Sequence, residues 1–512
     1  MLSTEFQVLS TLTQDPGPRT QDCLIGTQHL NYMQRKTKIV ATLGPASSDQ
    51  EVLNRMLQAG VDVVRLNFSH GKPEDHIQLA ETVRALARAR GKTVGVLVDL
   101  QGPKIRIGKF EHGKVTLNNG DSFILDSDCE LGNQERVGLD YKELPRDVSR
   151  GTTLLLDDGR IVMWVEEVRG NEISCTVKQG GVLSNNKGIN RQGGGLSASA
   201  LTEKDKEDIK TAVALKADYL AVSFPRDGAD MQLARKLMLA AGGKSMLVAK
   251  IERAEAITNL DEILDASDAI MVARGDLGVE VGDAAVPALQ KRMIRKAREK
   301  NKLAITATQM MESMISSPIP TRAEVSDVAN AVIDGTDAVM LSAETAAGQY
   351  PVEAVAAMDR VCIAAEKEYE TGFSKRRLSM QFNRVDESIA MSTMYTAYHL
   401  QVKAIAALTE SGSTALWMSR VNPDVPIYAL TPDVATRRKL TLFRGVYPVN
   451  FKPATQEREQ VLHEAEDELR RRGAVRDGDL IILTIGEPIG KSGGTNTMKI
   501  VKVGESRKTT NQ

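Results

Sequence analysis

The sequence predicts an α/β fold, a closed (β/α)8 TIM barrel with an inserted all-β lid domain and a C-terminal α/β domain. Three features lead to this prediction. Eight short apolar runs alternate with amphipathic segments between residues 38 and 341. Hairpin-like segments interrupt the alternation after the third run, and a separate strand-and-helix pattern follows the eighth.

The eight apolar runs have the length and composition of buried strands in a parallel sheet. Segments between them, such as 49–59, 75–90, 203–215 and 285–300, carry apolar residues at the spacing of amphipathic helices. A doubly wound sheet would place a glycine-rich phosphate loop after an early strand, and none follows here, so the barrel is favoured. The predicted strands are Lys38–Leu43, Asp62–Phe68, Thr93–Leu100, Tyr219–Phe224, Ser245–Ile251, Ala269–Ala273, Leu303–Thr308 and Ala338–Leu341.

The insert between the third and fourth strands has the pattern of a small all-β domain. Turn sequences such as Asn118-Asn119-Gly120-Asp121 separate its short β-rich segments, which is typical of hairpins. The insert leaves the barrel at the C-terminal end of a strand, where barrel enzymes have their active sites, so we expect a lid. Its predicted strands are Lys114–Leu117, Ser122–Leu125, Thr153–Leu156, Ile161–Val165 and Glu172–Val177.

The 512-residue chain exceeds the ~250–300 residues at which a single core stops growing, so several domains are expected. We predict an N-terminal extension (1–34), the barrel (35–108 and 197–350), the lid (109–196) and the C-terminal domain (351–512). Strands predicted in the last are Ala404–Leu408, Pro426–Leu430, Val446–Phe451, Asp479–Thr484 and Met498–Val503.

Composition limits the class of protein. The formal net charge of −1 gives no global basic field for nucleic acid or an anionic membrane, so anionic ligands need local positive charge. Cys23, Cys129, Cys175 and Cys362 lack metal-ligand spacing and are expected to be reduced thiols. Neither a spanning apolar run nor a secretory signal is present, and the expected location is the cytoplasm.

Charged side chains stand at the ends of several predicted barrel strands. Lys250 and Glu252 lie two residues apart on the fifth strand and therefore point the same way. Taken alone, the pair reads as a surface salt bridge. Asp276, after the sixth strand, gives Glu252 a second carboxylate with which to hold a metal, so we interpret Lys250 and Glu252 as two separate functions rather than one bond.

Other strand ends add to this site. Glu252 and Asp276 are hard oxygen ligands that suit Mg²⁺ or Mn²⁺. Arg65, Arg106 and Lys250 supply positive charge for a phosphoryl group, and Thr308 and Ser342 add hydroxyls. Simpler alternatives exist, in which Asp276 caps the following helix and Arg65 pairs with Asp99. The concentration of charge at one barrel mouth favours a functional site.

With these residues in view, the chain closely resembles the pyruvate kinase family from about residue 35 to 504. The resemblance is carried by the ends of the second and third strands and by ATLGPAS (41–47), AKIE (249–252), MVARGDLG (271–278), ATQM (307–310) and PTRAE (320–324). It implies transfer of a phosphoryl group from phosphoenolpyruvate to ADP, giving pyruvate and ATP in the last step of glycolysis. It also implies a homotetramer.

The resemblance implies a role for each residue at the barrel mouth. Glu252 and Asp276 hold the divalent metal, and Lys250 stabilises charge on the transferring phosphoryl group and the developing enolate. Arg65 holds the phosphate. Thr308 positions the substrate carboxylate with the backbone of Gly275, and is a candidate for relaying the proton that turns enolate into ketone.

The nucleotide side of the site follows from the same resemblance. Arg106 and Lys187, the latter on the lid, meet the nucleotide phosphates, together with Asn67 and a second metal carried by the nucleotide. Closure of the lid excludes water, which would otherwise accept the phosphoryl group.

One departure concerns the monovalent cation. Many members of the family need K⁺ and carry glutamate where this chain has Lys104, whereas the chain resembles the K⁺-independent branch. An ammonium is itself a monovalent cation, so activity without added K⁺ is expected. The residues of this region are Asn67, Ser69, Asp99, Leu100 and Lys104.

Two hydroxyl-rich loops in the C-terminal domain match the family's allosteric phosphate site. Each loop alone is also compatible with an ordinary turn, although exposed amides at a helix start favour an anion. Glu410 would repel a phosphate of fructose 1,6-bisphosphate, so a sugar monophosphate or AMP is the preferred activator. The implied site residues are Thr409, Ser411, Gly412, Ser413, Thr414, Lys491, Ser492, Gly493 and Thr495.

Two rival functions share parts of this pattern. A metal-dependent barrel lyase acting on a pyruvate enolate would need the carboxylates and Lys250, but not Arg106, Lys187 or a lid over a nucleotide. A catalytically silent sensor on the same fold is a third possibility. The intact set of Lys250, Glu252, Asp276 and Thr308 argues against it.

Overall fold

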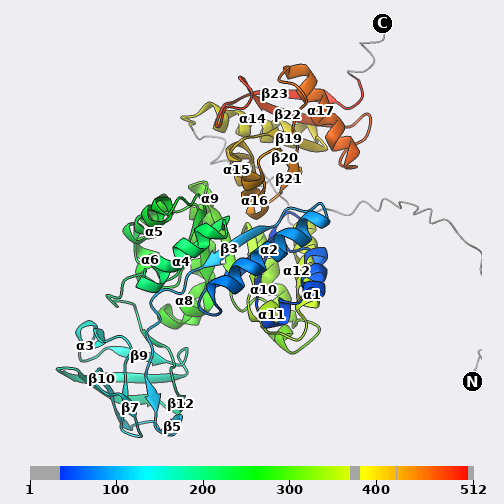
Figure 1. The fold of residues 1–512 in the computed structure, drawn as a ribbon. Helices are drawn as coiled ribbons and strands as arrows, with labels where there is room; N and C mark the ends of the chain where they lie inside the picture. Colours follow the sequence, from blue (N-terminus) through cyan, green and yellow to red (C-terminus); the bar gives the residue numbers. More distant parts are fainter. Residues whose placement is uncertain (1–34, 369–380, 422–423, 506–512) are drawn as a thin grey trace, which may run out of the picture. The chain divides into compact units, whose positions relative to one another are not determined.

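The computed structural model describes residues 35–368, 381–421 and 424–505 (Figure 1). Eight parallel strands form a closed barrel in the order β1-β18-β17-β16-β15-β14-β3-β2, which confirms the predicted barrel. Apolar runs form these strands because nearly all of their side chains are buried. The strands are β1 Lys38–Leu43, β2 Val63–Asn67, β3 Gly95–Asp99, β14 Tyr219–Val222, β15 Met246–Ile251, β16 Ala269–Ala273, β17 Leu303–Ala307 and β18 Ala338–Leu341.

Helices follow the barrel strands and bury their apolar faces against them. The side chains of Asp49 and Thr202 cap α1 and α4 by accepting backbone N–H bonds, at the beginning of two segments predicted to be amphipathic. The main helices are α1 Gln50–Ala59, α2 Pro73–Ala89, α4 Glu203–Ala214, α5 Gly228–Ala240, α6 Ala254–Thr258, α7 Leu260–Ala266, α8 Arg274–Val281, α9 Val286–Glu299, α10 Arg322–Ile333, α11 Ala343–Ala346 and α12 Pro351–Glu368. Val355, Met358 and Cys362 of α12 belong to the same hydrophobic core as these helices.

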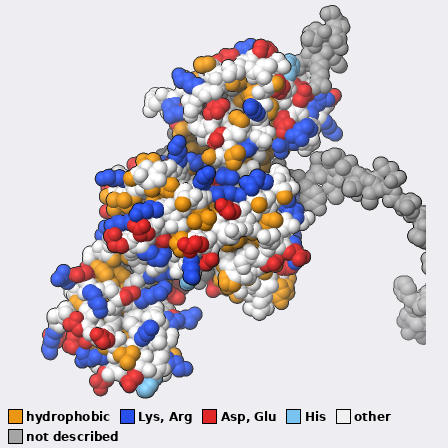
Figure 2. Space-filling model, in the orientation of Figure 1, with side chains coloured by type: hydrophobic (Ala, Val, Ile, Leu, Met, Phe, Trp, Pro, Cys, Tyr) orange, Lys and Arg blue, Asp and Glu red, His pale blue; other side chains and the backbone are white. Residues whose placement is uncertain are grey.

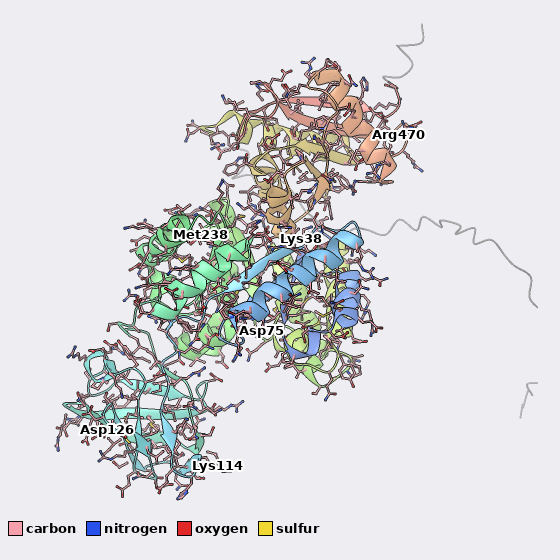
Figure 3. All side chains as sticks on the ribbon, in the orientation of Figure 1. Lys38, Asp75, Lys114, Asp126, Met238 and Arg470 are labelled. Carbon is pink, nitrogen blue, oxygen red and sulfur yellow. The ribbon has the colours of Figure 1, made fainter. Side chains whose placement is uncertain are left out.

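The insert is an all-β domain with its own hydrophobic core. One sheet has the strand order β13-β9-β10-β11-β6-β8, and β5 pairs with β12 in a second. Lys114 on β5 and Asp126 on β6 are labelled in Figure 3. Besides helix α3 (Leu144–Asp147), the elements are β4 Lys109–Phe110, β5 Lys114–Leu117, β6 Ser122–Asp126, β7 Leu131–Gly132, β8 Arg136–Gly138, β9 Thr153–Leu156, β10 Ile161–Arg169, β11 Glu172–Gln179, β12 Gly181–Ser184 and β13 Ile189–Arg191.

The C-terminal region is built on a five-stranded sheet in the order β21-β20-β19-β22-β23, in which only the β22–β23 pair is antiparallel. Five strands were predicted here, and all five are present. The elements are α14 Val385–Leu400, β19 Ala404–Leu408, α15 Ser413–Arg420, β20 Ile427–Thr431, α16 Val434–Lys439, β21 Val446–Asn450, α17 Arg458–Arg471, β22 Leu480–Gly486 and β23 Thr495–Lys502.

The molecular surface mixes charges of both signs on the face shown in Figure 2, in keeping with the small net charge. None of the helices in the described ranges is both long and apolar enough to cross a membrane. Cys129, Cys175 and Cys362 are free thiols, and Cys23 lies outside the described residues.

Candidate active site

The C-terminal ends of β15 and β16 place the principal charged residues side by side. These strands are paired in parallel, with Lys250 opposite Met271 and Ile251 opposite Val272. Lys250 is the penultimate residue of β15, and Glu252 follows the strand. Asp276 lies in the first turn of α8, which begins directly after β16. The topology therefore brings Glu252 and Asp276 to the same edge of the barrel, as predicted.

Lys250 is the centre of a buried ionic network. Its Nζ lies 2.8 Å from Oε1 of Glu252 and 3.3 Å from Oδ1 of Asp99, and it donates a hydrogen bond of 2.7 Å to Oγ of Ser223. Our expectation that Lys250 and Glu252 do not form a bond is wrong for this structure. Both groups are largely removed from water, and a buried charge needs an opposite charge beside it.

The protonation state of Lys250 follows from its neighbours. Burial by itself would lower the pKa of the ammonium, but Asp99 and Glu252 outweigh burial and raise the pKa above its usual value. Lys250 is therefore a permanent cation at neutral pH. A positive charge fixed in a dry site is the arrangement that stabilises a developing anion most strongly.

Arg65 is held by a second carboxylate. Its Nε donates to Oδ2 of Asp99 at 2.6 Å, and its Nη1 donates to Oγ1 of Thr42 at 3.0 Å. The pairing with Asp99 that we weighed as an alternative is thus present. Burial opposes ionisation of Asp99, but Lys250 and Arg65 prevail and hold its pKa below the usual range. Asp99 consequently fixes both cations in place.

Glu252 and Asp276 have the properties of a two-carboxylate metal site. Burial raises the pKa of each. The charge of Lys250 opposes this for both, whereas Asp276 adds to the rise for Glu252 and Asp158 adds to it for Asp276. A divalent cation would relieve this repulsion. Within residues 35–368, 381–421 and 424–505, no group of three or more His, Cys, Asp or Glu side chains could hold a metal. A cation held by this pair would thus complete its shell with water and substrate oxygens.

Lys104 lies within the electrostatic field of this site. Burial lowers the pKa of its ammonium, and Arg106 and Lys250 lower it further, while Asp276 and Asp99 act in the opposite direction. Asn67 accepts a hydrogen bond from the backbone N–H of Ser69 at 3.1 Å, which orders the predicted cation region.

Thr308 and Gly275 are joined directly. Oγ1 of Thr308 accepts a hydrogen bond of 2.8 Å from the N–H of Gly275. Thr308 and Gln309 both have positive φ, at 67° and 52°. A β-branched residue in this conformation is strained, and strain of this kind gathers at functional sites. Arg274, for which the sequence predicted no role, supports the strained turn by donating to the carbonyl oxygen of Thr308 at 2.7 Å.

Two further residues were missed at the end of β14. Phe224 has a φ of 55°, and its N–H donates to Oε2 of Glu252 at 2.9 Å. Ser223 accepts from Lys250. The rule that barrel strands end in functional residues points to both, but the sequence prediction took no site residue from the end of this strand.

Two of the predicted nucleotide residues, Arg106 and Lys187, lie where the lid joins the barrel. Arg106 forms an isolated antiparallel bridge with Gly188, and Nζ of Lys187 pairs with Oδ1 of Asp157 at 2.7 Å. The structure therefore puts Arg106 and Lys187 on adjacent segments. It shows no direct bond between either residue and Lys250 among the described contacts.

The two hydroxyl-rich loops of the C-terminal region line one pocket. Thr414 and Thr495, one from each loop, are hydrogen-bonded through their hydroxyls at 2.6 Å. Gly412 and Ser411 adjoin the pocket at the start of α15, and Ser492 is exposed beside it. Glu410 is part of the lining. The predicted residues among those that line the pocket are Thr409, Ser413, Thr414, Lys491, Gly493 and Thr495.

A barrel mouth with a fixed lysine, an arginine and two neighbouring carboxylates has the charge arrangement of an enzyme site for an anionic substrate. The family model of the pyruvate kinase barrel domain matches residues 34–355, and that of the pyruvate kinase alpha/beta domain matches residues 387–501. The chain belongs to the pyruvate kinase family, a family of phosphotransferases.

Individual relatives agree with this assignment. Pyruvate kinase II of Salmonella typhimurium is 55% identical over 475 residues, covering 92% of this chain and 99% of its own. Pyruvate kinase of Haemophilus influenzae is 53% identical, covering 88% and 96%. A crystal structure of a pyruvate kinase from Cryptosporidium parvum superposes with a TM-score of 0.85 at 36% identity, covering 92% and 96%. The resemblance seen in the motifs is confirmed.

Proposed function

We propose that the chain transfers the phosphoryl group of phosphoenolpyruvate to ADP, giving pyruvate and ATP as the last step of glycolysis. The observation that carries the proposal is the position of Lys250, a buried permanent cation within 2.8 Å of Glu252 and 3.3 Å of Asp99. A fixed cation held between Glu252 and Asp99, with Glu252 also a candidate metal ligand, suits a reaction in which negative charge moves from one oxygen to another.

Glu252 and Asp276 are the residues that would hold Mg²⁺ or Mn²⁺. The metal would supply charge neutralisation for the phosphate and enolate oxygens. The carboxylates fit this role because Glu252 is buried and Asp276 half-buried, and because the N–H of Phe224 fixes one oxygen of Glu252. In the metal-loaded enzyme Glu252 would share its charge between Lys250 and the cation.

Arg65 and Lys250 would both contact the transferring phosphoryl group. Arg65 is oriented by Asp99 and Thr42, so its guanidinium meets a phosphate without further ordering. Lys250 would stabilise charge on the phosphoryl group and on the enolate. Thr308 would position the substrate carboxylate together with the N–H of Gly275, and its hydroxyl would relay the proton that completes pyruvate.

Lys104 would take the place of K⁺. Its charge acts on the same carboxylates, Asp99 and Asp276, that the ion's field would act on. On this proposal activity needs no added K⁺. Arg106 and Lys187 would receive the phosphates of ADP with their metal, and the lid would exclude water from the transfer.

The pocket beside α15 would bind a phosphorylated activator. Lys491 supplies positive charge, and Thr414 and Thr495 supply hydroxyls. Glu410 in the same lining disfavours a second phosphate, so a sugar monophosphate or AMP is preferred over fructose 1,6-bisphosphate. We further propose a cytoplasmic homotetramer, on the likeness to the family.

A coupled assay of pyruvate formation tests the reaction and separates the rivals. The proposal requires pyruvate from phosphoenolpyruvate only when ADP and Mg²⁺ are both present. Pyruvate formed at the same rate without ADP would favour a lyase. No turnover with intact metal binding would favour a silent sensor. A large loss of rate when Na⁺ replaces K⁺ would contradict the role given to Lys104.

A further inference from the structure

The lid returns to the barrel through residues 190–198, here called the return segment. It contains Gly193, Gly194 and Gly195, whose φ angles are 81°, 80° and 94°. Three successive residues in this region need glycine, because other side chains rarely adopt it. The N–H of Gly193 donates to the carbonyl oxygen of Glu280 at 3.0 Å. The return segment is thus hydrogen-bonded to α8 at the turn formed by its three glycines.

Glu255, at the start of α6, holds the same turn from the other side. Its Oε1 accepts the N–H of Gly195, while its Oε2 is buried and has no hydrogen-bond partner among the described residues. A Cβ on Gly194 would stand 2.5 Å from that Oε2, so glycine is required there for contact as well as for conformation. The carboxylate of Glu255 therefore packs against the glycine turn.

Arg253 contacts the return segment farther along the chain. Its Nη1 lies 3.3 Å from the carbonyl oxygen of Leu196 and 3.5 Å from that of Ala198. The guanidinium also lies 5.6 Å from the centre of the Phe224 ring. Phe224 is the residue whose N–H fixes Glu252. Arg253 thus connects the lid's return segment to the residue that orients a metal ligand.

Glu280 ties the two barrel segments together. Its side chain is 4% exposed, and its Oε2 accepts the N–H of Ala254 at 2.9 Å. The side chain of Asn190, from the lid, also bonds to it. Glu255 lies three residues after Glu252, and Glu280 lies four residues after Asp276. The segments that hold the lid are therefore the segments that carry the two metal-competent carboxylates.

We propose that Arg253, Glu255 and Glu280 form a hinge clamp, a set of positioning residues that fixes the lid's return segment and couples lid position to Glu252 and Asp276. Through the clamp, a shift of either carboxylate on binding metal and substrate moves the hinge of the lid. The coupling rests on the proposed function, because closure over a nucleotide is what would make lid position matter. The hold on the return segment does not depend on it.

The charges around Glu280 give the clamp a pH dependence. Burial, and then the charge of Glu255, raise the pKa of Glu280 to about 7, although Arg253 and the N–H of Ala254 oppose them. Glu255 and Arg253 are the charged groups that face it. The clamped form favours the protonated carboxyl, so the clamp is strongest below the usual carboxyl pKa and weakens as pH rises toward 7.

Hydrogen–deuterium exchange of the ligand-free protein tests the clamp directly. Glu255→Ala should raise exchange in peptides covering residues 190–198 about tenfold, the factor expected for loss of one charge-assisted hydrogen bond. Glu255→Gln keeps an acceptor and should restore protection. Glu262→Ala, an exposed glutamate on α7, is the matched control. Unchanged exchange in Glu255→Ala would overturn the proposal.

A second variant changes the return segment instead of the clamp residues. Gly194→Ala pushes a methyl group against Glu255 and should expose the same peptides, even if Glu255→Ala folds poorly. Both variants should raise KM for ADP about tenfold while changing KM for phosphoenolpyruvate less than threefold, because the lid carries the nucleotide residues. Equal effects on both KM values would mean general damage and would contradict coupling.

The pH profile separates a clamp from a merely structural contact. Protection factors of the return segment should fall between pH 5 and pH 8 in the parent protein and stay level in Glu280→Gln. A parallel fall in both proteins would contradict the role of Glu280. If the parent protein formed no pyruvate from phosphoenolpyruvate and ADP, the proposed function would fail, and the exchange result would still decide the clamp.

Discussion

Arg420, the last residue of α15, forms a fully buried ion pair with Asp337, the residue that precedes barrel strand β18. Its Nη1 lies 2.8 Å from Oδ2 of Asp337 and also donates to the carbonyl oxygen of Lys302 at 2.8 Å. Asp337 in turn accepts the N–H of Ala304 at 2.9 Å. Helix α15 therefore starts at the hydroxyl-lined pocket and ends in the N-terminal rim of the barrel.

Breaking this pair should destabilise the protein strongly. Arg420→Met leaves the Asp337 carboxylate buried without its cation, which typically costs about 3–5 kcal/mol. Urea unfolding measures the loss. Arg146→Met is the control, since the Arg146 side chain is 83% exposed and its pair with Glu143 should contribute less than about 1 kcal/mol. A loss for Arg420→Met no larger than that of the control would contradict this account.

Lys250 should matter more to the rate than to substrate binding. Lys250→Met removes the fixed cation, and kcat should fall about 10³-fold or more, a loss of the size seen when a preorganised electrostatic group is deleted. KM for phosphoenolpyruvate should change much less. Because Asp99 and Glu252 would be left buried without their partner, unfolding must be measured in parallel. Lys250→Arg keeps the charge and should restore stability more fully than activity.

The sequence was sufficient for the fold because burial of the barrel strands is almost complete. Apolar runs such as Ala269–Ala273 and Ala338–Leu341 begin and end at the predicted residues, since every position in them is buried. The period of two also placed Lys250 and Glu252 on one side of β15. These features depend on local spacing, which a single sequence records.

The contacts around those residues were not predictable in the same way. The ion pair between Lys250 and Glu252 depends on how far each side chain is from water, which a sequence does not state. The hinge clamp depends on contacts of Glu255 with Gly195 and of Glu280 with Gly193, and these partners lie far apart in the sequence. The positive φ angles of Phe224 and Thr308 could not be predicted from the sequence either, because neither residue type favours this conformation.

Asp218 should make stability fall as pH rises. It is buried at the start of β14 and accepts the N–H of Val96 at 2.9 Å, and burial raises its pKa to about 6. The folded state then binds a proton more tightly than the unfolded state. The stabilisation is full below the unfolded pKa of about 4 and is lost as pH rises through about 6.

Asp218→Asn isolates this effect, because the amide oxygen can still accept from Val96. The variant should match the parent near pH 4 and become more stable than the parent by roughly 2–3 kcal/mol at pH 7. Chemical unfolding at several pH values measures the difference. A constant difference between the two proteins from pH 4 to pH 7 would show that Asp218 does not titrate in this range.

Lys104 should determine the response to monovalent cations. The parent enzyme is expected to keep its rate when Na⁺ or an organic cation replaces K⁺, because the ammonium of Lys104 already acts on Asp99 and Asp276. Lys104→Glu removes that charge and adds a carboxylate, so a bound cation becomes necessary to balance the site. We expect the variant to lose at least about tenfold in rate without K⁺ and to regain most of it with K⁺.

Lys109→Glu, at an exposed position on β4 of the lid, makes the same change of charge outside the site. Its rate should not depend on which monovalent cation is present. A Lys104→Glu enzyme indifferent to K⁺ would separate this residue from the cation's role, and a parent enzyme dependent on K⁺ would show that the ion binds beside the lysine rather than being replaced by it.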